Sequence, residues 1–175
     1  MNINIRQENE NDYANVYNVV QTAFANTEHS DGDEQNLVTR LRKSEAFVPE
    51  LSLVAEVDGE IVGHIMFTKI RIGDSDVLAL GLAPLAVLPE LQRSGIGGKL
   101  IEEGHKIAKE LGYVYSIVLG HEEYYPRFGY KPASIYGIKP PFPVSDENFM
   151  AIKLIKDETS TINGVVSYAK EFFEK

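Results

Sequence analysis

The sequence has 175 residues, of which 43% are hydrophobic and 25% charged, and its formal net charge is −9. This length suits one domain that buries roughly 70% of the surface of its unfolded chain, and the acidic excess disfavours nucleic acid as a partner because phosphates are repelled. The absence of cysteine excludes disulfides, thiolate metal ligands and a cysteine nucleophile. No segment has the apolar length of a signal peptide or a membrane span, so we expect a cytoplasmic protein without a membrane partner.

The N-terminal half combines two helix patterns with three strand patterns. Apolar residues recur at three- and four-residue spacing between positions 13 and 24, which predicts an amphipathic helix. Asp58-Gly59 separates two runs of β-forming residues and is typical of a two-residue hairpin turn. In chain order, the expected elements are a strand at Asn4–Glu8, a helix from the N-cap Asp12 to Ala25, a loop at Asn26–Asp33, a helix at Glu34–Ser44, and strands at Leu51–Val57 and Ile61–Ile72.

The C-terminal half predicts a strand, helix and strand crossover followed by shorter segments. A right-handed connection of this kind makes the two strands parallel. Pro84 should interrupt the first strand because proline has no N–H to donate. The expected elements are a turn at Gly73–Asp76, a strand at Val77–Leu88, a helix at Gly97–Leu111 followed by Gly112, a strand at Tyr113–Leu119, a short helical turn and loop within Gly120–Tyr130, a surface loop at Pro140–Pro143, and strands at Phe149–Leu154 and Gly164–Tyr168.

The position of three titratable side chains in these elements predicts whether each is buried or exposed. Two-residue hairpin pairing places His64 opposite Leu53 and on the face of Met66, which predicts a hydrogen-bonded core histidine. We expect Glu56 and His105 at the surface. The four histidines lack ligand-like spacing, so no metal site is expected.

The segment from Leu85 to Leu100 joins an apolar strand to an amphipathic helix through a glycine-rich turn, Gln92-Arg93-Ser94-Gly95-Ile96-Gly97-Gly98. Glycine lets backbone amides converge, and the free N–H groups at a helix N-terminus favour an anion. Because Arg93 and Lys99 add positive charge, the segment predicts a pyrophosphate-binding turn. Its spacing matches neither the dinucleotide fingerprint nor the P-loop.

The pattern Val87-x-Pro89-x-x-Gln92-x-x-Gly95-x-Gly97 resembles the acetyl-coenzyme A signature of the GNAT superfamily of N-acetyltransferases. The order of expected elements up to Leu154 is also similar to that of the family. The resemblance implies an α/β fold with a mixed, mostly antiparallel central sheet, in which a parallel strand pair forms the cofactor crevice and helices flank the sheet. It further implies a single N-acetyltransferase domain over residues 1–175, strongest over 1–154, with residues 155–175 as a C-terminal extension.

The resemblance also implies where acetyl-CoA is held. Backbone amides of residues 93–98 would bind the pyrophosphate, and residues 85–87 would pair with the pantetheine arm like a missing strand. In the family a bulge in this strand points an N–H at the thioester carbonyl, and Pro84 stands just before it; such an N–H stabilises the oxyanion. The implied cofactor-binding residues are Leu85, Ala86, Val87, Gln92, Arg93, Ser94, Gly95, Ile96, Gly97 and Gly98.

A second motif, Tyr125-Pro126-Arg127-Phe128-Gly129-Tyr130, looks like the family's Tyr-x-x-x-Gly-Phe element, with Tyr130 in place of the phenylalanine. By this resemblance Tyr125 is the catalytic acid that protonates the leaving thiolate, because a phenol with a pKa of about 10 keeps its proton at neutral pH. The neighbouring Tyr124 is expected to pack. Many family members carry an asparagine after the fifth strand, where Gly120 and His121 stand here, so different contacts are expected there.

The attacking amine must be neutral, whereas a free alkylammonium has a pKa near 10.4. His121, Glu122 and Glu123 follow the end of a strand and are candidate bases. The two carboxylates are equally well explained as acidic residues in the first turn of a short helix, and a water chain is a further option. The identity of the base therefore stays open.

The predicted function is transfer of an acetyl group from acetyl-CoA directly to a primary amine of a small molecule or peptide, without a metal. The identity of the amine stays open. One alternative is a non-catalytic sensor that binds acyl-CoA but releases no thiol with any amine. Another is an α/β interaction module without a cofactor, which the glycine-rich turn disfavours. The C-terminal tail and the loop at Pro140–Pro143 could also form the edge of a homodimer.

Overall fold

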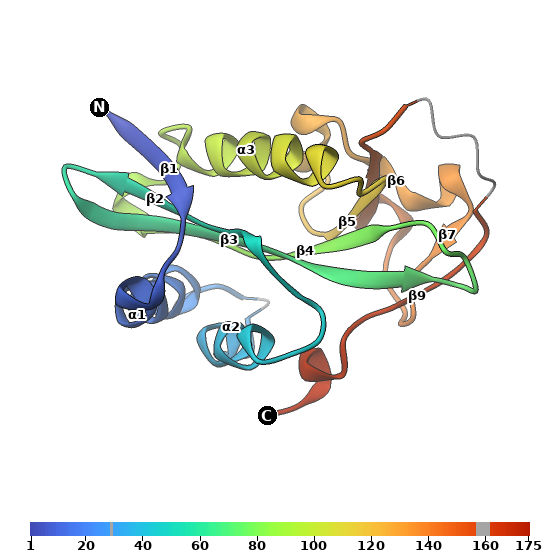
Figure 1. Cartoon of the computed structure of the whole chain (residues 1–175), viewed down its shortest axis with the longest axis horizontal. Helices are drawn as coiled ribbons and strands as arrows, with labels where there is room; N and C mark the ends of the chain where they lie inside the picture. The colour runs from blue at the N-terminus through green and yellow to red at the C-terminus, as the bar shows by residue number, and fades with distance from the viewer. Residues whose placement is uncertain (29, 157–161) are drawn as a thin grey trace.

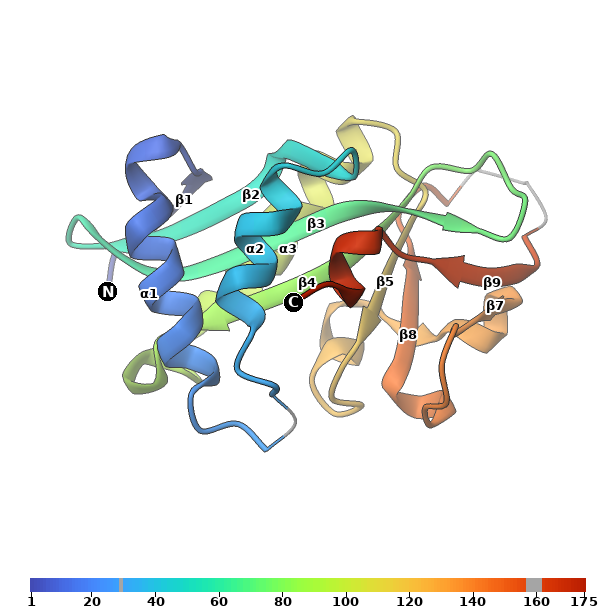
Figure 2. The same cartoon turned by 90° about the horizontal axis from the view of Figure 1, so that it is seen from below.

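The computed structural model describes residues 1–28, 30–156 and 162–175. His29 and residues 157–161 of the C-terminal extension lie outside the described residues. A twisted sheet separates the helix α3 (Ile96–Glu110) on one face from α1 (Tyr13–Phe24) and α2 (Glu34–Arg42) on the other (Figure 1, Figure 2). This arrangement confirms the expected α/β fold with helices on both faces of a mixed sheet.

The strands are mostly antiparallel, and those described are β1 (Ile3–Gln7), β2 (Phe47–Val57), β3 (Glu60–Ile72), β4 (Ala79–Val87), β5 (Tyr115–Leu119), β6 (Lys131–Pro132), β7 (Ile138–Lys139), β8 (Phe149–Lys153) and β9 (Gly164–Ser167). The main path through the sheet is β1-β2-β3-β4-β5-β8-β6, and β9 pairs with both β3 and β7. The pair β4–β5 is parallel, as the crossover through α3 predicts. The strand β9 is confirmed as well, whereas the two-residue strands β6 and β7 were not expected.

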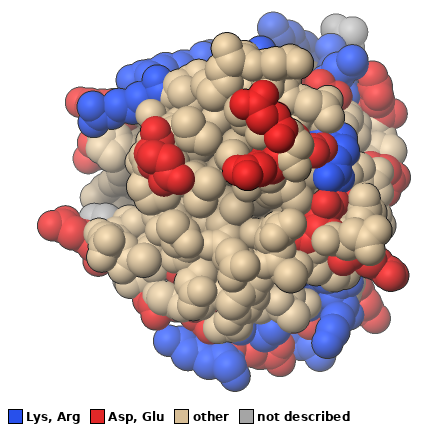
Figure 3. Space-filling model, turned by 90° about the vertical axis from the view of Figure 1, so that its left-hand side faces the viewer, with Lys and Arg blue, Asp and Glu red and all other residues tan. Residues whose placement is uncertain are grey.

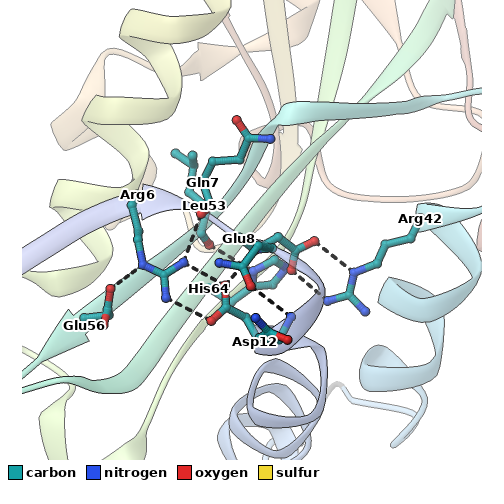
Figure 4. A network of polar contacts seen from close by, with 10 residues as sticks. Arg6, Gln7, Glu8, Asp12, Arg42, Leu53, Glu56 and His64 are labelled. Carbon is teal, nitrogen blue, oxygen red and sulfur yellow. Dashed lines mark hydrogen bonds and ion pairs between the residues drawn. The ribbon is translucent and has the colours of Figure 1, made fainter.

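The start of α1 differs from the prediction. Asp12 occupies the N-cap position as predicted, but its side chain accepts no hydrogen bond from the N–H groups in the first turn of α1. A short 3-10 turn precedes the helix and is capped by Asn9. The Asp12 carboxylate instead accepts the backbone N–H of Asn9 at 2.7 Å and pairs with Arg6 at 2.7 Å (Figure 4). This ion pair ties β1 to the start of α1.

The β2–β3 hairpin begins as predicted, with positive φ angles of 52° at Asp58 and 80° at Gly59. A bulge at Val62 of β3 then shifts the register, so that His64 pairs with Val54. The prediction of pairing opposite Leu53 is therefore wrong, because it extended the hairpin register past this bulge. The imidazole is nevertheless fully buried, with Nδ1 3.0 Å from the carbonyl oxygen of Leu53, which confirms a hydrogen-bonded core histidine.

Glu56 and His105 are less exposed than predicted. The Glu56 side chain is 20% exposed and pairs with Arg6 across β1 and β2 (Figure 4). His105 is half-buried on α3 with its Nε2 2.9 Å from the hydroxyl of Tyr130, and burial lowers its pKa to about 4. Both predictions were wrong because the residues that cover these side chains come from distant parts of the sequence.

A buried ion pair connects the start of the chain to α2. Arg42 donates two hydrogen bonds, of 2.8 and 2.9 Å, to the carboxylate of Glu8 (Figure 4). Its guanidinium also lies 3.9 Å from the centroid of the Tyr13 ring. Loss of one partner from such a pair is strongly destabilising, because the other charge stays buried without compensation. The Arg42 side chain therefore links α2 both to the end of β1 and to the start of α1.

The buried His64 predicts a pH dependence of stability. Burial lowers its pKa from 6.5 to about 4, because the charged imidazolium loses its hydration there. Between these values the unfolded chain binds more protons, so the free energy of unfolding should decrease as the pH falls from 6.5 towards 4. A shift of this size corresponds to roughly 3 kcal/mol. Urea unfolding between pH 7.5 and 4 should show this loss.

The variant His64→Gln should lack most of this part of the pH dependence. The half-buried His105 keeps its own contribution in that variant, because burial lowers its pKa as well. The matched control is His121→Gln, which removes an exposed imidazole. A His64→Gln profile parallel to that of the wild type would contradict the assignment.

Candidate active site

The parallel pairing of β4 with β5 ends early. Gly81 pairs with Ile117, and no later residue of β4 pairs with β5 in the described part of the chain. Beyond this point β4 stays paired with β3, while β5 continues beside β8 through Leu119. The two strands therefore separate, which leaves the β5-facing backbone of β4 available to a ligand.

A bulge interrupts β4 where the strands separate, as predicted at Pro84. Leu82 pairs with Phe67 of β3 and Leu85 with Ile65, so Ala83 and Pro84 together lie opposite a single residue of β3. The peptide bond between Ala83 and Pro84 is cis. Residues 85–87, which the sequence assigns to cofactor binding, follow this bulge and remain paired with β3 on their other side.

Side-chain hydrogen bonds shape the turn between β4 and α3. Gln92 donates its amide N–H to the carbonyl oxygen of Val87 at 3.2 Å, and the hydroxyl of Ser94 donates to the carbonyl of Leu91. Gly95 has a φ of 90° and stands at the N-cap of α3. This left-handed conformation favours glycine.

The same turn presents polar groups to solvent. Arg93 and Ser94 are exposed, whereas the side chain of Ile96 is buried in the core. The first N–H groups of a helix have no intrahelical acceptor. The N-terminus of α3 therefore offers backbone N–H groups, beside the Arg93 guanidinium, to an anion.

The two sequence motifs contact one another at the start of α3. A Cβ atom at Gly97 would lie 2.5 Å from the hydroxyl oxygen of Tyr124, and one at Gly98 would lie 3.0 Å from the ring of Phe128. The two aromatic rings are 5.3 Å apart in an edge-on arrangement. These glycines thus leave room for aromatic rings. Their sequence spacing does not reveal this contact.

Tyr125 begins the 3-10 turn Tyr125–Phe128 and lies against Gly120, directly after β5. A Cβ atom at Gly120 would be 2.3 Å from Cε2 of the Tyr125 ring. The ring also contacts Tyr124 and Tyr130 edge-on, at centroid distances of 5.1 and 5.7 Å. Burial raises the pKa of Tyr125 well above its usual value, so the hydroxyl keeps its proton at neutral pH.

Tyr130, which replaces the phenylalanine of the family motif, is fully buried. Its hydroxyl oxygen lies 2.8 Å from Oγ of Ser116 and 2.9 Å from Nε2 of His105. A buried hydroxyl requires such partners. The Tyr130 hydroxyl therefore connects the second motif to β5 and α3. The position of His105 in the sequence of α3 did not reveal that it is one of the two partners of this hydroxyl.

The three candidate bases are exposed after β5. Asn148 donates its amide N–H groups to the Glu122 carboxylate at 2.8 Å and to the carbonyl oxygen of Gly120 at 3.1 Å. Hydrogen bonds from its own backbone and from Asn148 lower the pKa of Glu122, which weakens it as a base. His121 Nδ1 accepts the backbone N–H of Glu123 at 3.2 Å.

A cavity of about 470 Å³ opens between α2, the β4–β5 end of the sheet and the C-terminal segment, residues 164–175. Leu82 and Ala83 of β4 and Leu119 of β5 line it, so it reaches the point where the two strands separate. No sequence motif indicated that the C-terminal segment is part of the site. Its aromatic residues were a signal, but their position depends on the pairing of β9 with β3.

Among the described residues, no three His, Asp or Glu side chains are grouped to hold a metal ion, and no helix is long and apolar enough to cross a membrane. On the face at the left of Figure 1, acidic side chains stand within a broad uncharged area, and Lys and Arg lie towards its edges (Figure 3). This face lacks the continuous positive surface that binds nucleic acid.

The contact between Gly120 and Tyr125 predicts an energetic coupling. Gly120→Ala should destabilise the fold by about 1–3 kcal/mol, because the new methyl group overlaps the Tyr125 ring. In Tyr125→Leu, which removes the ring, the same substitution should cost much less. Urea unfolding of the two single variants and the double variant measures the coupling energy. Additive effects would show that the ring does not occupy this position.

Comparison with known proteins gives family matches over most of the chain. The profile described as acetyltransferase (GNAT) domain matches residues 4–133. The chain is 42% identical over 119 residues to the uncharacterized N-acetyltransferase YjhQ of Escherichia coli K12, covering 66% of this chain and 65% of that protein. It is 31% identical over 140 residues to the uncharacterized N-acetyltransferase YhbS of the same strain, covering 79% and 83%. The chain thus spans slightly less than two thirds of YjhQ.

Two solved structures share the fold over 98% of this chain. A GNAT family acetyltransferase from Brucella melitensis, in complex with acetyl-CoA, has 34% identity and a TM-score of 0.81 over 98% of its own chain. YhbS from Escherichia coli, in complex with CoA, has 27% identity and a TM-score of 0.89 over 92% of its chain. Together with the profile match, these similarities confirm the resemblance seen in the motifs: the chain belongs to the GNAT family of acetyltransferases.

Proposed function

We propose that this protein is an N-acetyltransferase that moves the acetyl group of acetyl-CoA directly to a primary amine. The observation that carries the proposal is the separation of β4 from β5 beside the glycine-led start of α3, with Tyr125 at the end of β5. The similar structures from Brucella melitensis and Escherichia coli hold acetyl-CoA and CoA, which supports the same ligand here. Use of acetyl-CoA also fits the cytoplasmic location expected from the sequence.

The residues of this chain fit such a ligand. The N-terminus of α3 and the exposed Arg93 suit a diphosphate, which takes several charge-assisted hydrogen bonds. The backbone of β4 beyond Gly81 can pair with the amides of an extended pantetheine arm, much as a sheet edge accepts an added strand. The proposed binding residues are Leu85, Ala86, Val87, Gln92, Arg93, Ser94, Gly95, Ile96, Gly97 and Gly98.

Acetyl-CoA supplies a reactive thioester to this site. Backbone N–H groups of residues 85–87 stabilise the negative charge that develops on the carbonyl oxygen. The lone pair of the neutral amine forms the new N–C bond while the C–S bond breaks, and the Tyr125 hydroxyl gives its proton to the sulfur. The proton that leaves the amine nitrogen restores the Tyr125 hydroxyl. One further proton, from the ammonium form of the substrate, passes to solvent before the attack.

The proton that the ammonium form of the substrate loses before the attack has four candidate acceptors: His121, Glu122, Glu123 and water. In the described part of the chain, none of the three side chains lines the cavity next to Leu82 and Ala83. Glu122 is also engaged by Asn148. These positions favour proton transfer through water.

Calorimetric titration with acetyl-CoA tests the ligand and its place. We expect micromolar binding by the wild type and about tenfold weaker binding by Arg93→Glu, because the new carboxylate repels the diphosphate. The matched control is Lys109→Glu, which makes the same charge change in the last turn of α3. Equal weakening in both variants would mean that net charge alone controls binding. Absence of binding by the wild type would refute the proposal.

Tyr125→Phe removes only the hydroxyl proposed as the acid. Its kcat should fall roughly 100-fold, while acetyl-CoA binding should stay unchanged. Thiol release in the presence of a panel of primary amines is the measurement. Tyr124→Phe distinguishes the neighbouring hydroxyl: a larger loss in that variant would transfer the acid role to Tyr124. A wild type that binds acetyl-CoA but releases no thiol with any amine would instead be a non-catalytic sensor.

A further inference from the structure

The cavity beside β4 and β5 is well placed to hold the amine acceptor. Its volume of about 470 Å³ falls within the range of roughly 300–1,000 Å³ typical of small-molecule sites. Leu82 and Ala83 line it immediately before residues 85–87, and Leu119 lines it immediately before Gly120. A molecule in the cavity is therefore next to the bulge in β4 and to Leu119, whose neighbour Gly120 packs against the Tyr125 ring. Figure 1 and Figure 2 show α2 and the C-terminal turn side by side on the same face of the sheet.

One wall of the cavity is aromatic. Phe142 and Tyr168 stack with an interplanar angle of 9° and a centroid distance of 6.3 Å, and Phe172 lies 5.3 Å from Tyr168. Burial raises the pKa of Tyr168 to about 12, so this wall is uncharged at neutral pH. Such a wall binds apolar or aromatic groups. It disfavours a charged group such as a carboxylate, because that group would lose its hydration there.

The charged residues that line the cavity, called its acidic side below, carry an excess of negative charge. Two cationic side chains line it, and each is paired: Arg40 with Asp33 at 3.0 Å and Lys175 with Asp31 at 3.8 Å. Two further carboxylates, Glu34 and Glu174, line the same cavity. The Glu34 carboxylate accepts a hydrogen bond from the uncharged hydroxyl of Ser30 at 2.7 Å. The cavity therefore suits a cation and offers no unpaired cation, among its described lining residues, to an acceptor's carboxylate.

The C-terminal segment is held in place by the same arginine. Arg40 donates from Nε to the carbonyl oxygen of Glu171 at 3.2 Å while its Nη2 pairs with Asp33. This links α2 to the 3-10 turn Lys170–Phe173 that carries Phe172. The aromatic wall and the acidic side of the cavity are thus joined by direct contacts.

We propose that this cavity binds a primary alkylamine with an aromatic or bulky apolar body and no carboxylate. The inference rests on the proposed acetyltransferase function and assigns its substrate class. The aromatic wall holds the apolar body, and the carboxylates attract the ammonium form before it loses its proton. The product is an uncharged amide, which loses the attraction to the acidic side and so leaves readily.

Thiol release from acetyl-CoA with three amines tests this class. 2-Phenylethylamine should be acetylated with a kcat/KM about 100-fold above that of L-phenylalanine, which adds only a carboxylate. Spermidine, which is cationic but lacks an apolar body, should also be a poorer acceptor. Equal values for 2-phenylethylamine and L-phenylalanine would overturn the inference.

Variants locate the binding to this cavity. Phe172→Ala should raise the KM for 2-phenylethylamine about tenfold with little change in kcat or in acetyl-CoA binding. Glu34→Gln should reduce the ratio of kcat/KM for 2-phenylethylamine to that for L-phenylalanine, because it removes a negative charge that repels the carboxylate of L-phenylalanine. The control Ile135→Ala truncates an exposed apolar side chain that does not line the cavity. Unchanged KM in Phe172→Ala would place the acceptor elsewhere.

The outcomes separate the inference from the function on which it rests. Turnover of spermidine or a peptide amine, without turnover of 2-phenylethylamine, would overturn the substrate class and leave an N-acetyltransferase. Absence of thiol release with every amine would remove the proposed function and the inference together. Calorimetric binding of acetyl-CoA under the same conditions shows that the protein tested is folded.

Discussion

The site depends on one interruption in backbone pairing. β4 remains hydrogen-bonded to β3 on both sides of the Ala83-Pro84 bulge, but its pairing with β5 ends at Gly81. A continuous sheet would satisfy these backbone groups internally and leave nothing for a ligand. Because β5 is paired with β8 along its whole length, the sheet stays intact while an edge opens within it. The helix start, Tyr125 and the cavity all lie around this edge.

Close contacts between glycines and aromatic rings hold the two motifs together. Gly97 and Gly120 have little room for a side chain because the rings of Tyr124 and Tyr125 lie against them. The ring of Phe67 likewise lies against Gly104, which lets α3 pack close to the sheet. In a core packed at crystal-like density, such contacts restrict the position of each element to fractions of an ångström. The position of Tyr125, the proposed acid, therefore depends on the small residues against which it packs.

Most of the fold could be predicted because its signals act over a few residues. Turn residues such as Asp58-Gly59, the periodicity of α3 and the missing N–H of Pro84 each restrict the local backbone directly. The register of His64 could not be predicted, since a bulge depends on how two whole strands pack against the helices. The burial of His105 was missed for a similar reason: its partner Tyr130 lies on a different segment.

The sequence by itself determined the family, the glycine-rich turn and the candidate acid Tyr125, because each rests on a short run of residues with its own spacing. The tertiary structure decided which surfaces meet. It packed the Tyr125 ring against Gly120, and it brought Phe172 from the C-terminal segment to the cavity beside β4. Such contacts join segments far apart in the chain, and packing of the complete core determines them rather than any local pattern.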